Sequence, residues 1–342
     1  MREIHIVEPH TSGVPVQPSD AQRRWLDLGF GLAFHYGINT FHDVEASDGS
    51  LNPASFAPAH FDPGQWTAMA RLCGARYLLL ITKHLDGFCM WPTRQTDYSV
   101  LASPCRRDIL GEVIAAARSA GLKVALYYSF WEMREPSYHD DRAYAFHVKR
   151  QLSELLTNYG EIVSLWLDGL WNKGAIDYFD PERTHWREIY EHVKCLQPDC
   201  LVGVNPTTHH PGKVVLWPCD FRIGEKAAPP DDDRNVYYCD GKGHFLPWES
   251  LFTLSEGGMK HGLFADGKWF WHADDETCHP SEWVLDRLRQ CRRGGANLLI
   301  NAGPDRNGRL RDVDRACLEE VGRAVATEPN VMDSHIGIRA EV

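Results

Sequence analysis

The sequence lacks the hydrophobic segments of a membrane or secreted protein. No run among its 342 residues approaches the roughly 18–20 apolar residues that span a bilayer. The opening residues also lack the apolar core, about 7–15 residues long, of a secretory signal. From these absences we expect no membrane partner and a cytoplasmic location.

Basic clusters and metal-binding motifs are missing as well. The chain carries 47 acidic against 36 basic residues and no dense Lys/Arg run, which argues against a nucleic-acid partner. Its ten cysteines include no CxxC pair, and its 17 histidines include no HExxH motif. No P-loop or GxGxxG motif follows an apolar run. We therefore expect free thiols, no metal and no cofactor.

What the sequence does contain is an alternation of short apolar runs with stretches of helical periodicity, which is typical of β-α-β units. We expect eight strands, at Phe30–Phe34, Tyr77–Thr82, Val124–Tyr128, Val163–Leu167, Leu201–Val204, Phe221–Ile223, Lys268–Trp271 and Asn297–Ile300. We expect helices around Trp66–Cys73, Ile109–Ala117, Val148–Tyr159, Trp186–Leu196, 280–293 and 311–326. The prediction is one α/β domain over residues 1–342, a (β/α)8 TIM-like barrel. The long stretches 39–62 and 206–248 are expected to be functional loops.

The residues that follow the predicted strands are polar and aromatic, and reactive groups of such barrels lie at the carboxyl ends of strands. They include His35, His84, Asp86, Trp131, Glu132, Asp168, Glu225, Trp271 and Asn301. Aromatic rings cover the apolar face of a pyranose, while charged and imidazole groups hydrogen-bond its hydroxyls. The pattern therefore indicates a sugar site. Asp168 and Glu225 could form a glycosidase acid pair, although an Asp after a strand is more often a helix cap or an ion-pair partner.

Four segments resemble the α-L-fucosidases of glycoside hydrolase family 29, in the order in which that family carries them. They are Phe30–Phe41, Thr82–Pro92, Leu155–Gly169 and Gly295–Pro304. The resemblance covers nearly the whole chain, from about Trp25 to Val325, and it falls on the strands that periodicity predicts.

The resemblance implies a retaining exo-glycosidase that acts on a small α-L-fucoside, a related 6-deoxyhexoside or an oligosaccharide. Asp168 matches the nucleophile, and Glu225 matches the acid/base of the subgroup that cleaves 1,3/1,4 linkages, with Glu249 as the reserve candidate. His35, His84 and Tyr128 match sugar-holding positions, and Glu45 matches a hydroxyl-binding Glu. Further residues expected to line or orient the site are Trp131, Arg222 and Trp271.

The chain departs from the family pattern at two positions that bear on the substrate. Leu85 stands where the family has a second His, and Ala46 stands where it has Trp. Both changes remove a polar contact, so a sugar other than fucose is a possible substrate. We also expect a single catalytic domain without the C-terminal β-sandwich common in the family. Two alternatives stay open, a non-catalytic sugar-binding pseudoenzyme and a transglycosylase or other biosynthetic enzyme.

Overall fold

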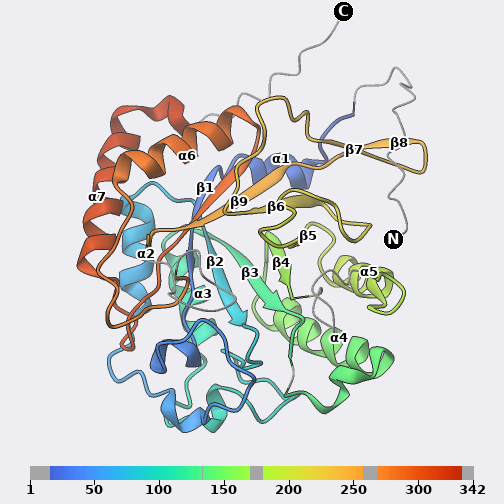
Figure 1. Ribbon diagram of the computed structural model, residues 1–342, viewed down its shortest axis with the longest axis vertical. Coiled ribbons are helices and arrows are strands. Elements are labelled where there is room, and N and C mark those ends of the chain that lie inside the picture. Colours follow the sequence, from blue (N-terminus) through green and yellow to red (C-terminus); the bar gives the residue numbers. More distant parts are fainter. Residues whose placement is uncertain (1–15, 133, 170–179, 257–267, 333–342) are drawn as a thin grey trace, which may run out of the picture.

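The protein, seen here in a computed structural model that describes residues 16–132, 134–169, 180–256 and 268–332, is built around a closed barrel of parallel strands (Figure 1). The strand order around the barrel is β1-β10-β9-β6-β5-β4-β3-β2. These strands are β1 (Phe30–Phe34), β2 (Tyr77–Lys83), β3 (Lys123–Ser129), β4 (Ser164–Asp168), β5 (Leu201–Val204), β6 (Phe221–Glu225), β9 (Trp248–Thr253) and β10 (Asn297–Asn301). The predicted (β/α)8 class is confirmed.

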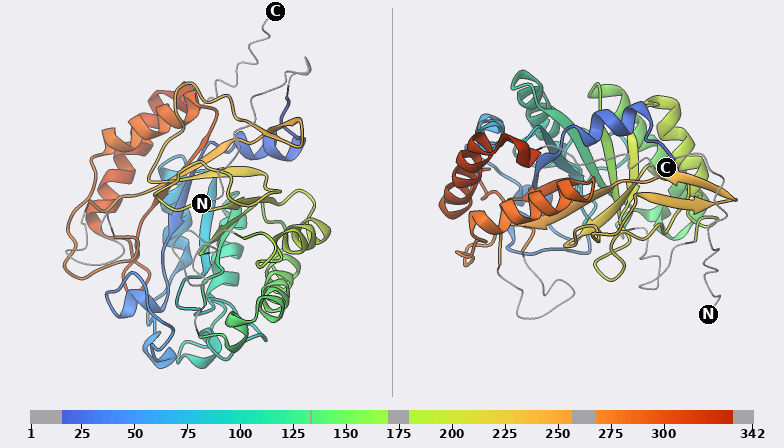
Figure 2. Two further views of the ribbon diagram at one scale, coloured as in Figure 1. Left: turned by 45° about the vertical axis from the view of Figure 1, so that its right-hand side comes forward. Right: turned by 90° about the horizontal axis from the view of Figure 1, so that it is seen from above.

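Helices surround the barrel, with α6 and α7 on one flank and α4 and α5 on the other (Figures 1 and 2). The α-helices are α1 (Asp20–Leu26), α2 (Pro63–Leu72), α3 (Ile109–Ser119), α4 (Asp141–Asn158), α5 (Trp186–Leu196), α6 (Ser281–Arg293) and α7 (Asp312–Thr327). Short 3₁₀ helices lie at Ile38–Phe41, Pro53–Ser55, Val100–Ala102, Pro136–His139 and Pro329–Met332. No α-helix joins β5 to β6 or β6 to β9, two connections that are described throughout. The connection from β6 to β9 contains the antiparallel hairpin that is formed by β7 (Val236–Cys239) and β8 (Lys242–Phe245). None of the described helices is long and apolar enough to cross a membrane.

Acidic side chains cap the amino-terminal ends of several helices, and α4 begins seven residues before its predicted start because of such a cap at Asp140. The Asp108 carboxylate accepts the backbone N–H of Gly111 at 2.8 Å, and Asp140 caps α4 in the same way at the N–H of Ala143. Such a cap stabilises a helix by about 1 kcal/mol because it satisfies an otherwise unpaired donor. The apolar stripes then turn toward the barrel wall and are buried.

The seventh barrel strand is not the one that the sequence predicted. β9, at Trp248–Thr253, pairs with both β6 and β10, whereas the predicted strand Lys268–Trp271 has no strand structure. Glu249 and Ser250 interrupt the apolar run of β9, so the criterion of continuous hydrophobicity missed it. Trp269 and Phe270 are buried because they pack across the barrel mouth, without joining the sheet.

Alternation along the strands divides the buried residues into two apolar clusters, one inside the barrel and one under the helices. Tyr127 belongs to the inner cluster and its neighbour Tyr128 to the outer one. Trp25 of α1 packs on Phe221, with ring centroids 4.9 Å apart, so α1 covers the amino end of the barrel. A Cβ atom at Gly31 would lie 2.6 Å from the Tyr77 ring, so glycine makes room for this ring inside the barrel.

A buried carboxyl group lies in the amino-terminal layer of the barrel interior. Glu249 has no exposed surface, and its Oε1 accepts the Tyr77 hydroxyl at 2.7 Å. Its Oε2 has no hydrogen-bond partner in the part of the chain that the structure describes. Burial raises the pKa of Glu249 to about 8, so this side chain is neutral at pH 7.

We expect Glu249→Gln to flatten the dependence of stability on pH. The folded-state pKa of Glu249 lies above its unfolded value, so its contribution is complete below about pH 4.5 and is lost as the pH rises toward 8. Between pH 5 and 8 the wild type should lose about 3–4 kcal/mol of unfolding free energy more than the Gln variant. Urea titrations at both pH values measure this difference. The same substitution at the exposed Glu276 serves as the control, and an equal change in both variants would contradict the assignment.

Candidate active site

The carboxyl ends of the barrel strands bring polar side chains together at one mouth. His35 and His84 directly follow β1 and β2, and Asn205 directly follows β5. Asp168, Glu225 and Asn301 are the last residues of β4, β6 and β10. The strand ends named from the sequence therefore do converge, and Asn205 joins them.

Asp168 and Glu225 are held next to each other by one amide. The Asn205 Nδ2 donates to Asp168 Oδ1 at 3.0 Å and to Glu225 Oε2 at 2.8 Å. Because both oxygens lie within 3.0 Å of one nitrogen, they are no more than about 6 Å apart. The backbone N–H of Thr207 donates to Asn205 Oδ1 at 3.1 Å and thereby fixes the orientation of the amide. The Tyr127 hydroxyl donates to the other oxygen of Asp168.

The environment shifts the pKa values of the two carboxyl groups in ways that suit different protonation states. Burial raises the pKa of Glu225 to about 7, and the adjacent negative charge of Asp168 adds to this effect. Burial also raises the pKa of Asp168, but hydrogen bonds from Tyr127, the Gly169 backbone and Asn205 oppose the shift. Three donors thus stabilise the charged form of Asp168, whereas Asn205 is the one donor to Glu225 among the residues that the structure describes.

The two predicted histidines form the opposite wall of the mouth. The His35 Nδ1 donates to Asn301 Oδ1 at 2.7 Å, and burial lowers the pKa of His35 to about 4. Burial also lowers the pKa of His84 well below its usual value, so both rings are neutral at pH 7. The His84 ring stacks on Tyr127, with centroids 5.6 Å apart. Its Nδ1 is buried and has no hydrogen-bond partner among the described residues, so it is available to a ligand hydroxyl.

Glu45 is buried and positions the segment that closes one side of the mouth. Its Oε2 accepts the backbone N–H of Trp269 at 2.9 Å, and its Oε1 contacts His272 Nε2 at 2.7 Å. The aromatic rings of this segment then pack on the histidines, with centroid distances of 5.2 Å for Trp269–His35 and 4.9 Å for Phe270–His84. In this structure both oxygens of Glu45 are therefore engaged by the protein itself.

Two of the predicted substrate-binding residues face away from the barrel interior. The Tyr128 hydroxyl donates to Gln151 Oε1 at 2.6 Å, behind the wall of β3. The Arg222 guanidinium forms a bidentate pair with Asp233, at 2.8 and 2.6 Å. The reason is the two-residue period of a strand, which turns Tyr127 and Ile223 inward and their neighbours outward. Tyr128 and Arg222 therefore do not face the barrel mouth in this structure, and Tyr127 is the tyrosine of β3 that does.

The remaining predicted residues, Trp131 and Trp271, lie in loops beside the mouth and are partly exposed. A Cβ atom at Gly169 would lie 2.8 Å from the Trp131 Cβ, so Trp131 adjoins the nucleophile candidate. Trp271 lies beneath the Arg306 guanidinium, 5.4 Å from its ring centroid. Both indoles are therefore close to the site but outside its buried floor.

Comparison with known proteins identifies the family of this barrel. The family model described as Alpha-L-fucosidase matches residues 30–328. The chain belongs to the α-L-fucosidase family. It is 44% identical over 312 residues to putative alpha-L-fucosidase 1 of Oryza sativa subsp. japonica, covering 89% of this chain and 57% of that protein. It is 31% identical over 334 residues to alpha-L-fucosidase 1 of Arabidopsis thaliana, covering 92% and 61%.

The fold comparison agrees with this family assignment. A crystal structure of a glycoside hydrolase 29 family member from an unknown rumen bacterium superposes with a TM-score of 0.77. It is 26% identical, and the match covers 91% of this chain and 57% of that one. The chain thus spans little more than half the length of these relatives.

One cluster near the site of this α-L-fucosidase family member has side chains of the kinds that bind metals. Ligand atoms of Glu132, Glu135 and His147 all lie within 4.8 Å of one another, between the end of β3 and α4. The Lys83 ammonium, however, is hydrogen-bonded to Glu132. The positive charge beside the Glu132 carboxylate is therefore that of Lys83.

Asn205, Tyr127, Trp269 and Phe270 belong to the site but were not among the residues predicted from the sequence. Asn205 had a detectable signal, because it is the polar residue directly after a predicted strand. Tyr127 lies within its strand, and only the inward or outward phase of β3 separates it from Tyr128. No sequence pattern marked Trp269 and Phe270 as site residues, because a loop brings them to the barrel mouth only in the folded protein.

Proposed function

We propose that this family member is a retaining exo-glycosidase that hydrolyses an α-L-fucoside or a related 6-deoxyhexoside. We further propose that residues 1–342 act as one catalytic unit. The observation that carries the proposal is the Asp168–Asn205–Glu225 bridge, which keeps two carboxyl oxygens within about 6 Å. Retaining glycosidases place their carboxyl groups roughly 5–5.5 Å apart, whereas inverting enzymes need roughly 6.5–9.5 Å to admit a water.

In the first step, the ionised Asp168 attacks the anomeric carbon and the glycosidic bond breaks. Glu225, neutral because of its raised pKa, transfers its proton to the departing oxygen. The products of this step are a glycosyl ester on Asp168 and a free aglycone alcohol. In the second step, Glu225 takes a proton from water, which attacks the same carbon and releases both the sugar and the Asp168 carboxylate.

The neighbouring groups prepare the two carboxyls for these different roles. Tyr127 and Asn205 both donate to Asp168 and keep it charged. The neutral histidines His35 and His84 can bond sugar hydroxyls without introducing a second positive charge at the oxocarbenium-like transition state. Trp269 and Phe270 supply apolar surface for the sugar ring.

The proposal is tested by following hydrolysis of an aryl α-L-fucoside with ¹H NMR. We expect the α-anomer of free fucose to appear first, because two displacements restore the original configuration. Initial formation of the β-anomer would contradict the mechanism, and binding without turnover would favour a sugar-binding pseudoenzyme. Transfer of the sugar to an added alcohol in preference to water would favour a transglycosylase.

The same assay with related 6-deoxyglycosides tests the substitutions near the sugar. Leu85 is buried beside His84, and Ala46 adjoins Glu45. Each lacks the N–H that a hydroxyl could meet, which is worth about 0.5–1.5 kcal/mol per lost hydrogen bond. We expect a 6-deoxyhexoside in which one hydroxyl of fucose is missing, methylated or inverted to match or exceed the fucoside in kcat/KM. A strong preference for fucose would show that other groups replace these contacts.

Asn205→Ala should lower kcat by about 100-fold, because a preorganised donor to both carboxyls is removed. The hydrogen bonds from Asn205 lower the pKa of Asp168 and of Glu225, so their loss should move both limbs of the pH–rate profile to higher pH. The full pH dependence of kcat measures this shift. A variant that merely loosened the fold would lower the rate without moving either limb.

A further inference from the structure

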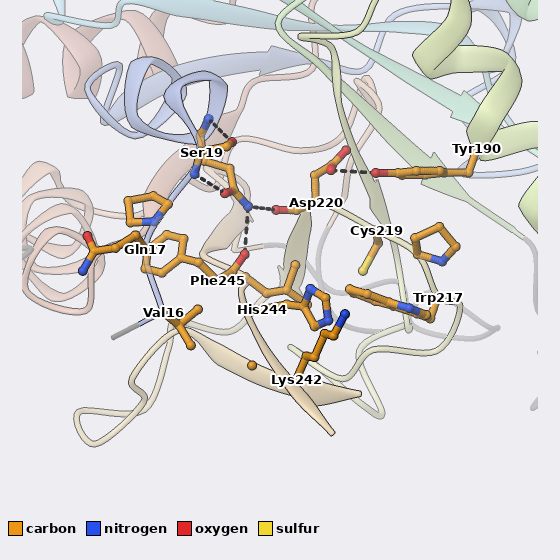
Figure 3. A pocket seen from close by; sticks show the side chains of 15 residues that line it. Val16, Gln17, Ser19, Tyr190, Trp217, Cys219, Asp220, Lys242, His244 and Phe245 are labelled. Carbon is orange, nitrogen blue, oxygen red and sulfur yellow. Dashed lines mark hydrogen bonds between the residues drawn. The ribbon is translucent and has the colours of Figure 1, made fainter. Parts of the chain in front are cut away.

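A second hollow lies at the opposite end of the barrel from the acid pair. It has a volume of about 700 Å³ and is lined by α1, α5, the loop before β6, and β8 (Figure 3). Asp220 lines it, and Glu225 lies five residues further along the same chain segment. At about 3.3 Å per residue, the hollow and the acid pair are roughly 16 Å apart along β6. A ligand here therefore cannot be part of the sugar undergoing hydrolysis.

Several polar groups of this hollow already have partners in the protein. The Gln22 amide donates to the carbonyls of Asp220 and Phe245, both at 2.8 Å. The Asp220 carboxylate accepts the Tyr190 hydroxyl at 2.8 Å and pairs with Lys194 at 2.5 Å. Figure 3 shows the hydrogen bond between Asp220 and Tyr190. The acidic group of the hollow is thus neutralised.

Two side chains on the outer wall, Trp217 and Lys242, have polar groups without a partner among the described residues. The indole of Trp217 contacts His244 and Tyr237 through its ring, with centroids 4.6 and 5.4 Å apart, and its N–H donates to no described residue. Lys242 and His244 are two residues apart on β8 and therefore share a face. Within the part of the chain that the structure describes, the Lys242 ammonium has no ion pair or hydrogen bond. Figure 3 shows Lys242, His244 and Trp217 at the same end of the hollow.

This combination matches a specific ligand chemistry. An indole that is partly exposed offers an apolar face to the C–H groups of a pyranose. The free indole N–H and ammonium donate hydrogen bonds to hydroxyl and carboxylate oxygens. Among the described residues that line the hollow, Lys242 is the only cation. One cation suits a singly charged carboxylate better than a doubly charged phosphate monoester.

We propose that this hollow is a second, non-catalytic binding site for an acidic sugar residue, such as a uronic acid. The pyranose ring lies against Trp217, and its carboxylate pairs with Lys242. Such a site would retain an acidic glycan on the enzyme while another sugar residue is processed at the barrel mouth. Binding at this hollow does not require the acid pair to be active.

The test compares methyl β-glucuronide with methyl β-glucoside, two sugars that differ only at C6, which is a carboxylate in the first and a hydroxymethyl group in the second. We expect saturation-transfer NMR titrations to show tighter binding of the glucuronide by about fivefold or more, decreasing as salt is added. Trp217→Ala should weaken binding of both sugars by about tenfold, because the stacking surface is lost. Lys242 lies on an exposed strand, and Lys242→Met should lower the affinity for the glucuronide to that for the glucoside.

Matched controls separate this site from the barrel mouth. Tyr238→Ala removes an exposed aromatic ring of the same hairpin that does not line the hollow, and it should leave both affinities unchanged. None of the three variants should change hydrolysis of an aryl glycoside. Equal affinity for the two sugars, binding unchanged in Lys242→Met, or tighter binding of adenosine monophosphate would each overturn the proposal.

Discussion

Asp168→Ala is expected to lower kcat/KM for an aryl α-L-fucoside by about 10⁴-fold or more, because the proposed nucleophile is removed. Asp168 ends β4, is partly accessible and accepts hydrogen bonds from Tyr127 and Asn205. These donors would stay in place around the shortened side chain. Steady-state kinetics on a nitrophenyl glycoside measure the loss.

Added azide provides the decisive control for this variant. In the proposed mechanism the space left by the carboxylate faces the anomeric carbon, so azide can attack there and expel the nitrophenolate in one displacement. The product would be a β-linked glycosyl azide, since one displacement inverts the configuration. Tyr127→Phe, which removes only a donor to Asp168, should show a smaller loss and no response to azide. An Asp168→Ala enzyme that retains activity or forms an α-linked azide would refute the nucleophile assignment.

Glu225→Gln is expected to produce a loss that depends on the leaving group. Hydrolysis of a glycoside with an alkyl leaving group should fall by about 10²–10⁴-fold, because the departing oxygen no longer receives a proton. A glycosyl fluoride needs little protonation, so formation of the covalent intermediate should be much less affected. A burst of fluoride release followed by slow turnover would report this pattern. Equal losses on both substrates would instead assign Glu225 a structural role.

The pH–rate profile of the wild type should reflect the same carboxyl group. In the proposed role Glu225 can act as an acid only while it is protonated, and burial raises its pKa to about 7. The rate with an alkyl glycoside should therefore fall as the pH rises through about 7, and Glu225→Gln should remove this alkaline limb. Glu249→Gln, which changes a carboxyl at the other end of the barrel, should leave the limb in place. Persistence of the limb in Glu225→Gln would show that another group is the acid.

The tertiary structure distinguishes the two acid candidates, Glu225 and Glu249, because it places them at opposite ends of the barrel. Glu249 is in register with Ile223 and Asn297, in the amino-terminal half of the barrel, and it bonds Tyr77. Glu225 ends its strand at the opposite mouth, next to Asp168. The two residues are similar in sequence context, since each lies near a short apolar run.

The sequence by itself determined the barrel class, seven of its eight strands, the family and the positions of Asp168, Glu225, His35 and His84. It could do so because buried parallel strands are continuously apolar, and reactive residues directly follow them. Only the tertiary structure decided that Tyr127 and not Tyr128 faces the site, that Arg222 pairs with Asp233, and that Glu45 holds a distant loop. Strand phase and long-range loop packing arise from contacts between residues far apart in the chain, and local periodicity carries no information about them.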